Sequence, residues 1–254
     1  MNNQKKLGVS LSGGAIRAVA HLGFLSRLIE EGLTPSKISG VSGGAIIAAF
    51  VCDGYTPKET LSIFKEYQIS RFFSPTWAPG LMSMSRLHKA VKKHIRTTTF
   101  EEFKIPLYIY ATNLNTEKLA TFHSGDILNP LIASCSIPVL FKPVMIDSNS
   151  YVDGGVIDNL PIKDLKDCDV TIGINVNPRI GEKSISNMMS VAMRVFKLIT
   201  YSHSTYHKNE FDYYMCPKDL KNYKLFDGRK IDEIFHIGEQ SADSHMDQIK
   251  KSMQ

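Results

Sequence analysis

A serine flanked by glycines is the residue in this chain best suited to act as a nucleophile. Ser42 stands in Gly40-Val41-Ser42-Gly43-Gly44, which fits the pattern G-x-S-x-G. In hydrolases this pattern forms a tight turn between a strand and a helix, and the helix dipole favours negative charge developing at the hydroxyl. The sequence predicts that Ser42 attacks an acyl group. The structural alternative is a glycine-rich turn with an incidental serine.

A second glycine-rich turn offers hydrogen-bond donors. Gly13 and Gly14 follow a short apolar run, and Ala15 and Arg17 come directly after them. Glycines at a strand-to-helix turn leave backbone N–H groups free to face a ligand, and the tetrahedral oxyanion of acyl transfer needs such donors. A nucleotide phosphate loop is the rival interpretation, but neither the G-x-G-x-x-G spacing nor a following G-K-[ST] is present.

A third turn carries a carboxylate, because Asp153 directly precedes Gly154 and Gly155. Asp-Gly is also an ordinary turn dipeptide, so this pair alone does not indicate a site. A free aspartate, with a pKa of ~3.9, is a poor base for a serine hydroxyl in water. Partial burial would raise that pKa, so a catalytic role for Asp153 predicts a buried position.

These turns need rigid elements to hold them, and the hydrophobic pattern predicts such elements. Short aliphatic runs predict strands, and apolar residues at helical spacing predict helices. Strands and helices alternate, which predicts an α/β fold of three layers, with a mostly parallel central sheet, helices on both faces and ligands beyond the carboxyl ends of the strands. The predicted strands are 7–11, 38–41, 107–114, 119–123 and 170–176, and the predicted helices are 18–29, 43–52, 56–67, 127–134, 185–199 and 242–253.

The composition bounds the class of protein. With 254 residues, 43% of them hydrophobic, the chain can bury a sizeable core, and we expect one domain over residues 1–254. The net charge of +5 comes from scattered cations without interleaved aromatic residues, so no nucleic-acid partner is expected. The sequence predicts no particular oligomeric state.

Cysteine usage and hydropathy indicate the compartment. The four cysteines form no C-x-x-C pair, which argues against a zinc ribbon and fits a reducing environment. The first residues are polar, without a signal-peptide core, and no stretch approaches the ~20 apolar residues needed to span a bilayer. We therefore expect a cytoplasmic protein.

Together the three turns resemble those of the patatin-like phospholipase family, and the resemblance covers most of the chain. The glycine-rich motif with its basic residue, the G-x-S-x-G motif and the D-G-G motif are all similar to the family's, and so are several stretches between them. The matching segments are Gly13 to Ala18, Ala20 to Gly23, Gly40 to Gly44, Ala111 to Leu114, Ala133 to Pro138, Phe141 to Val144 and Asp153 to Gly155.

The resemblance implies a patatin-like fold and a catalytic dyad. Ser42 would be the nucleophile and Asp153 its base, and the backbone N–H groups of Gly13, Gly14 and Ala15 would form the oxyanion hole. The implied reaction is hydrolysis of fatty-acyl esters in phospholipids or neutral lipids through an acyl-enzyme. It needs no metal and no cofactor. A lipid substrate also implies transient, peripheral contact with a membrane surface.

The chain departs from the family pattern in the glycine-rich motif. Ala15 and Ala18 stand where the family has glycine. A methyl group at Ala15 could close off a positive φ or crowd the oxyanion site. Arg17 has two interpretations: it anchors the glycine loop through carbonyl groups, or it contacts a phosphate head group.

Two apolar segments also have alternative interpretations. Residues 70–85 are rich in aromatic residues and prolines, which is typical either of a lid or membrane-contact segment, or of a loop folded onto its own core. Met188, Met189 and Met193 are expected to pack in the core or to line the acyl pocket.

Two other functions remain open from the residues alone. A Ser-His-Asp esterase acting on small esters would need one of the histidines that follow Asp153: His203, His207, His236 or His245. His203 and His207 are four apart, but no third metal ligand is evident, and His21 is expected to be structural. The alanines of the glycine loop favour the other alternative, a catalytically silent lipid-binding protein.

Overall fold

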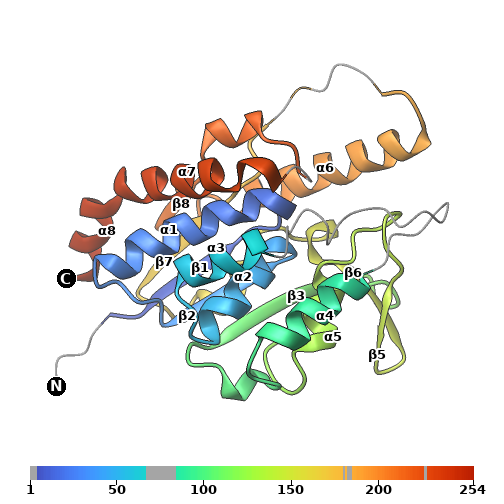
Figure 1. The fold of residues 1–254 in the computed structure, drawn as a ribbon, viewed down its shortest axis with the longest axis horizontal. Helices are drawn as coiled ribbons and strands as arrows, with labels where there is room; N and C mark the ends of the chain where they lie inside the picture. Colours follow the sequence, from blue (N-terminus) through green and yellow to red (C-terminus); the bar gives the residue numbers. More distant parts are fainter. Residues whose placement is uncertain (1–4, 67–83, 180, 182–184, 226–227) are drawn as a thin grey trace.

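A mostly parallel sheet organises the chain (Figure 1). The computed structural model describes residues 5–66, 84–179, 181, 185–225 and 228–254. The strand order is β5-β6-β3-β2-β1-β7-β8, and β4 pairs with β3 outside this path. Pairing is parallel among β1, β2, β3, β7 and β8 and antiparallel for β4, β5 and β6. The strands are β1 (Leu7–Leu11), β2 (Lys37–Val41), β3 (Leu107–Asn113), β4 (Lys118–Phe122), β5 (Val144–Ile146), β6 (Asn149–Asp153), β7 (Val170–Ile174) and β8 (Tyr213–Met215).

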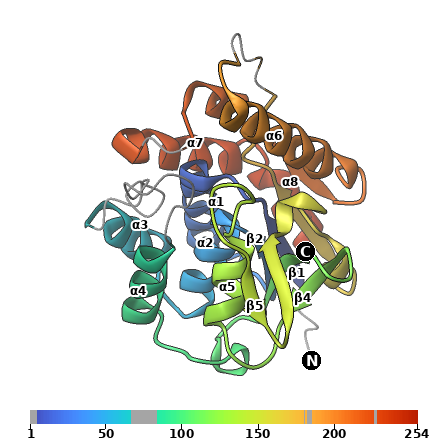
Figure 2. The same cartoon turned by 90° about the vertical axis from the view of Figure 1, so that its right-hand side faces the viewer.

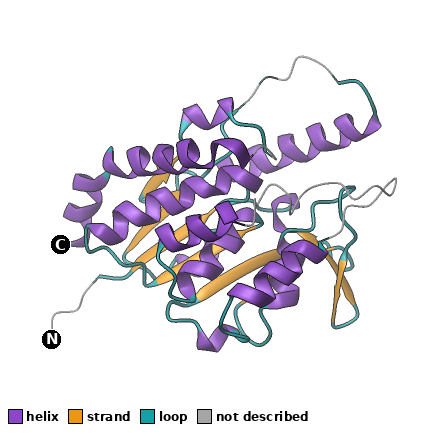
Figure 3. Cartoon of the chain, in the orientation of Figure 1, coloured by secondary structure: helices purple, strands orange, loops and turns teal. Residues whose placement is uncertain are grey.

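Helices pack on this sheet and extend beyond it (Figures 2 and 3). The α-helices are α1 (Val19–Glu30), α2 (Gly43–Cys52), α3 (Pro57–Glu66), α4 (Ser85–His94), α5 (Leu128–Ser134), α6 (Met188–Tyr206), α7 (Ile231–Asp243) and α8 (Met246–Met253). The short 3₁₀ helices are η1 (Ala15–Ala18), η3 (Phe100–Glu102), η4 (Gly154–Val156), η5 (Lys163–Leu165), η6 (Lys218–Asn222) and η7 (Gly228–Lys230).

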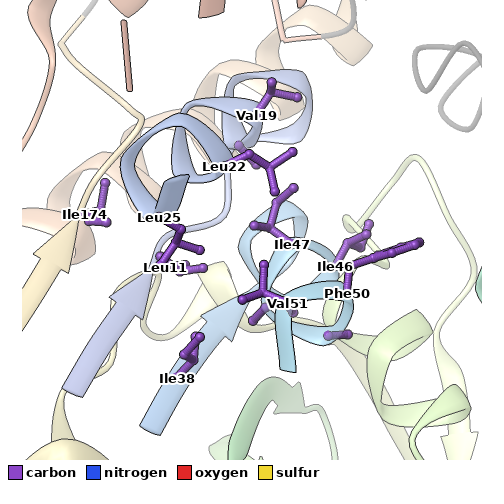
Figure 4. Packing of buried hydrophobic residues seen from close by; sticks show 14 of the residues in the cluster. Leu11, Val19, Leu22, Leu25, Ile38, Ile46, Ile47, Phe50, Val51 and Ile174 are labelled. Atoms are coloured by element: carbon purple, nitrogen blue, oxygen red, sulfur yellow. The ribbon is translucent and has the colours of Figure 1, made fainter. Parts of the chain in front are cut away.

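Alternating side chains on β1 show how the two faces of the sheet are covered. Val9 and Leu11 are fully buried in the cluster that includes α1 and α2 (Figure 4). Ser10, which points to the opposite face, donates a hydrogen bond to the carbonyl of Pro161 (2.8 Å), close to η5. The predicted three-layer α/β architecture is confirmed, and the short 3₁₀ helix η5 packs against β1 and β2.

Most of the predicted elements near the three turns form as expected. β1 and α2 begin and end at the predicted residues. α3 starts with a reciprocal cap: Glu59 N–H donates to the Thr56 hydroxyl (3.2 Å), and Thr56 N–H donates to the Glu59 carboxylate (2.8 Å). The sequence pattern did not predict β5, β6, β8, α4 or α7.

The predicted C-terminal helix over 242–253 is confirmed for residues 246–253, which form α8, but its predicted start is wrong, because residues 242 and 243 belong to α7. α7 ends at Asp243, and His245 adopts a non-helical conformation before α8. The Ser244 hydroxyl donates to the carbonyl of Ser241 (2.9 Å), and the His245 ring lies 3.0 Å from the same carbonyl. These side chains satisfy a backbone carbonyl in the last turn of α7, and this favours a break over a continued helix.

The long helix α6 forms as predicted, but two of its methionines do not lie where expected. Met188 is 83% exposed and Met189 is 42% exposed, so the prediction that they pack in the core or line the acyl pocket is wrong. Met193 does line the cavity described below. The reason is that α6 buries a face with small polar residues, Thr200 and Ser204, and turns its apolar stripe outward.

Two further expectations concern membranes. Within the described part of the chain, no helix is both long enough and apolar enough to cross a bilayer. The segment 70–85, expected to be a lid or a folded loop, lies outside the described residues except for Met84 and Ser85, where α4 starts.

The packing of α1 against α7 generates a stability prediction. A Cβ at Gly238 would lie 1.9 Å from the carbonyl oxygen of Ala20, so Gly238→Ala should force the two helices apart. We expect a loss of about 1–3 kcal/mol in the free energy of unfolding, despite the better helix propensity of alanine. Urea denaturation measures this loss. Gln240→Ala, at an exposed position of the same helix, is the control, and equal stability of the two variants would contradict the packing argument.

Candidate active site

Three turns that are far apart in sequence meet in one cavity of about 1120 Å³. Ser42, Asp153, Arg17 and the loop Gly13-Gly14-Ala15 all line it, at the end of the sheet where β1 and β2 finish. The structure thus brings the predicted nucleophile, base and donor loop together. The remaining predicted residues do not line the cavity and lie next to Ser42 or Asp153 in β2, α2 and η4: Gly40, Val41, Gly43, Gly44, Gly154 and Gly155.

Ser42 occupies a strained turn between β2 and α2. Its φ is +53° and its ψ is −125°, a conformation that L-residues rarely adopt and that tight packing must maintain. Its N–H donates to the Ser134 hydroxyl (2.8 Å). A Cβ at Gly44 would lie 2.4 Å from the Leu11 carbonyl oxygen, so only glycine lets α2 start this close to β1. The serine side chain is therefore held at the first turn of a buried helix.

The pairing of β3 explains how Asp153 reaches Ser42. β4 pairs with residues 109–113 of β3, so β2 (on 107–110) and β6 (on 111–113) must share the other edge, end to end. Val41 is opposite Tyr110, and Asp153 is opposite the next residue, Ala111. β2 is parallel to β3 and β6 antiparallel, so their carboxyl ends meet. This places Asp153 beside Ser42.

The carboxyl group of Asp153 is buried and only half-satisfied. Its Oδ1 accepts the Gly155 N–H (2.9 Å), whereas its Oδ2 has no hydrogen-bond partner among the described residues. Burial raises the pKa of Asp153 to about 7, although the neighbouring Ser42 hydroxyl and the Gly155 N–H favour the charged form. Burial also raises the pKa of the adjacent Cys135 thiol well above its usual range, so this thiol stays neutral. Asp153 is therefore a much better base than a solvated aspartate.

Two asparagines fix the orientation of the glycine loop. The Asn177 side chain donates to the carbonyl of Gly13 (2.5 Å), and Asn159 makes a longer contact with the same oxygen (3.5 Å). Because the peptide is planar and trans, holding this carbonyl turns the Gly14 N–H to the opposite side. Within the described residues, the N–H groups of Gly13, Gly14 and Ala15 donate to no protein acceptor. The loop can therefore offer donors to a ligand.

Sequence reasoning missed Asn177 and assigned no role to Asn159. The signal for Asn177 was its position three residues after the buried strand β7, which pairs with β1, because side chains near the carboxyl ends of such strands meet ligands. Ser134 lies in a stretch that matched the family, but nothing in its spacing revealed that it binds the Ser42 backbone.

Ala15 does adopt a positive φ, of +48°. The methyl group therefore does not close off this conformation, which costs an alanine about 1–2 kcal/mol relative to the right-handed region. The Ile16 N–H donates to the carbonyl of Leu225 (3.0 Å), so the next residue ties the strained turn to a distant segment.

Arg17 makes carbonyl contacts from a buried position. Its Nε and Nη2 donate to the carbonyl of Tyr223, at 2.8 Å and 2.5 Å. These bonds support the anchor interpretation, but the carbonyl belongs to the segment after η6 and not to the glycine loop itself. The arginine thereby holds one wall of the cavity against the loop.

None of the eight histidines, all of which the structure describes, lines this cavity. His21 is buried and its Nε2 donates to the carbonyl of Ser12 (2.9 Å), and burial lowers its pKa to about 4, so it is neutral. His207 pairs with Asp158 (3.3 Å) and with Glu210. The described ranges contain no group of three side chains able to hold a metal ion. The geometry thus gives Ser42 a carboxylate neighbour and no imidazole.

The chain is similar to several known proteins. A family model described as patatin-like phospholipase matches residues 9–166. "Lysophospholipase NTE1" of Kluyveromyces lactis is 24% identical, with 91% of this chain and 18% of that protein covered, and its Saccharomyces cerevisiae counterpart is 23% identical, with 91% and 16% covered. This chain therefore spans less than a fifth of those relatives.

Two other similar proteins are nearer in length. "Uncharacterized protein YqhO" of Bacillus subtilis is 27% identical, and 77% of this chain and 81% of YqhO are covered. The crystal structure of VipD from Legionella pneumophila has a TM-score of 0.57 at 14% identity, over 96% of this chain and 67% of VipD, which shows a shared fold.

The buried carboxylate generates a pH-dependent stability prediction. Because burial raises the pKa of Asp153 to about 7 in the folded state, that state binds a proton more tightly than the unfolded chain between about pH 4 and 7. Stability should therefore fall as pH rises through this window. Asn cannot ionise and its amide oxygen can still accept the Gly155 N–H. We expect Asp153→Asn to be more stable than the native chain at pH 8, by up to about 4 kcal/mol, and nearly equal at pH 4.

Urea denaturation at pH 4, 6 and 8 tests this expectation. Asp147→Asn makes the same chemical change at an exposed turn and serves as the control. A constant difference between Asp153→Asn and the native chain at all three pH values would contradict a raised pKa at Asp153.

Proposed function

Because the chain belongs to the patatin-like phospholipase family, we propose that it is a serine hydrolase of fatty-acyl esters in lipids, built as one catalytic domain over residues 1–254. Ser42 is the nucleophile and Asp153 is the base. One observation carries the proposal: a strained serine and a buried carboxylate lie side by side in one cavity. Among the described residues, one carboxylate oxygen and the N–H groups of the cavity's glycine loop have no hydrogen-bond partner.

In the acylation step, Oγ of Ser42 attacks the ester carbonyl carbon while Oδ2 of Asp153 takes the hydroxyl proton. The carbonyl oxygen becomes an oxyanion, which accepts hydrogen bonds from the N–H groups of Gly13, Gly14 and Ala15. The tetrahedral intermediate then collapses, the C–O bond to the alcohol breaks, and Asp153 returns its proton to that alcohol. A lysophospholipid would release a glycerophospho-alcohol at this point.

Deacylation repeats these steps with water. The water oxygen attacks the acyl carbon while Asp153 takes a proton from the water. The same N–H groups bind the second oxyanion. The bond to Oγ of Ser42 then breaks, the fatty acid is released, and Oγ takes the proton back from Asp153. Each lost oxyanion donor typically costs about 10²–10³-fold in turnover, so the hold of Asn177 on the Gly13 carbonyl supports the rate indirectly.

The cavity suits a lipid. Its volume of about 1120 Å³ is at or above the ~300–1,000 Å³ typical of drug-sized ligand sites. Ile137, Met193, Phe196 and Leu198 give its lining an apolar part able to hold an acyl chain. The name of the NTE1 relatives supports lysophospholipids as a first substrate class to examine.

Replacing the nucleophile is the direct test of this proposal. We expect Ser42→Ala to lose at least about 10³-fold in turnover of both p-nitrophenyl butyrate and lysophosphatidylcholine, because the proposed acyl-enzyme forms on the Ser42 hydroxyl. A fluorophosphonate probe should label the native chain and not this variant. Ser62→Ala, on the exposed face of α3, should behave as the native chain. Failure of the probe to label Ser42 would favour a catalytically silent lipid-binding protein.

The raised pKa of Asp153 predicts the pH profile. The base must be ionised, so kcat/KM for p-nitrophenyl butyrate should rise about tenfold per pH unit up to about pH 7 and level off above it. An imidazole would give a similar profile, so the histidines must be replaced singly. We expect the profile to survive His203→Gln, His207→Gln, His236→Gln and His245→Gln. Loss of activity in one of these variants, with its fold intact, would support a Ser-His-Asp enzyme.

A further inference from the structure

An apolar stripe on the outer face of α6 has no role in the proposed reaction. Met188, Val191, Val195 and Leu198 follow one another at steps of three, four and three residues, so they share one side of the helix. They are 83%, 40%, 48% and 51% exposed. α6 lies along the outside of the molecule in both Figure 1 and Figure 2. Four large exposed apolar side chains in a row on a helix are typical of an interaction surface.

The stripe meets the active-site cavity at Leu198, and we call this side of the cavity its mouth. The inner side of α6 lines the cavity with Phe196, Thr200 and Tyr201, and Thr200 is buried. Leu198 belongs to both surfaces, because it lines the cavity and is half-exposed in the stripe. One helix therefore joins an outward apolar surface to the cavity that contains Ser42.

The charged side chains that line the cavity are almost all positive. α6 has no acidic residue, and its cations Arg194 and Lys197 face the cavity. Among the described lining residues, Asp153 is the only acid, and it is buried. Apart from the buried Arg17, the cations lining the cavity are Arg179, Arg194, Lys197, Lys221 and Lys224.

We infer that the outer face of α6 docks onto a bilayer that contains anionic phospholipid. An amphipathic helix binds such a surface by sinking its apolar face to the boundary between head groups and acyl chains, while flanking cations meet phosphates. Docking through Met188, Val191 and Val195 brings the cavity mouth to the membrane, so that a lipid enters past Leu198 without crossing water. This inference rests on the proposed function, because docking serves to deliver a lipid substrate to Ser42.

A second copy of the chain fits this face less well than a membrane does. Pairing two α6 stripes would bring Arg194 and Lys197 of each copy close to those of the other, and like charges repel. It would also cover the cavity mouth bordered by Leu198. A bilayer surface instead offers opposite charge and the lipid itself.

Vesicle sedimentation tests the inference directly. The probes are phosphatidylcholine vesicles with and without about one third phosphatidylglycerol. The test variant is Met188→Gln/Val191→Gln/Val195→Gln, which spares every residue that lines the cavity and keeps good helix formers. The control, Leu114→Gln/Met145→Gln, removes two exposed apolar side chains far from α6 in sequence.

We expect the native chain and the control to bind the anionic vesicles at low salt, with weaker binding at high salt. The triple variant should bind at least about tenfold more weakly, because three apolar side chains no longer enter the interface. Its turnover of p-nitrophenyl butyrate, a soluble ester, should match the native chain, which shows an intact fold. The triple variant, which binds vesicles more weakly, should also hydrolyse lipid in those vesicles more slowly than the native chain.

Three outcomes would overturn the inference: equal binding by the triple variant and the native chain, no binding of the native chain to anionic vesicles, or a native dimer in analytical ultracentrifugation that the triple variant abolishes. Vesicle binding by Ser42→Ala separates this inference from the proposed function. If that variant binds and the native chain hydrolyses no ester, docking stands and the catalytic proposal fails. If the native chain hydrolyses soluble ester without binding vesicles, the catalytic proposal stands and docking fails.

Discussion

The burial of one carboxyl group, that of Asp153, is the constraint on which the rest of the site depends. Removing a carboxylate from water is costly, and here its Oδ2 has no compensating hydrogen bond among the described residues. The cost appears as a pKa of about 7, which matches the group to proton transfer near neutral pH. The surroundings must therefore be rigid enough to hold an unfavourable group in place. The backbone does this: the Asp153 N–H donates to Ser136 and the Thr112 hydroxyl donates to the Asp153 carbonyl.

The same rigidity maintains two strained turns. Ser42 and Ala15 both hold a positive φ, and each is fixed by neighbours that are distant in sequence. The cluster in Figure 4 joins β1, β2, α1 and α2 into one packed unit, and both turns leave directly from it. A large core close to the site can offset the local strain, as proteins commonly do where function needs unfavourable geometry.

The helix α6 shows what the spacing of apolar residues can and cannot predict. The spacing of apolar residues predicted the helix, and the helix formed. The same spacing did not reveal that the apolar stripe of Met188, Val191 and Val195 faces outward, because a core and a membrane surface favour the same kind of face. Only the tertiary structure, in which α6 buries the small polar residues Thr200 and Ser204, showed which face of the helix is exposed.

The sequence by itself determined the candidate site residues and their local scaffolds. Ser42 on a strand-turn-helix, the Gly13-Gly14 loop and the Asp153 turn each have short-range signatures, because tight turns and helix starts restrict residue type locally. The tertiary structure alone decided how these pieces meet. Asp153 reaches Ser42 because β2 and β6 share one edge of β3 end to end, and the pairing of short antiparallel strands leaves little trace in the sequence. The roles of Asn177 and Ser134, and the pKa of Asp153, likewise follow from contacts and burial between distant segments, which no local pattern encodes.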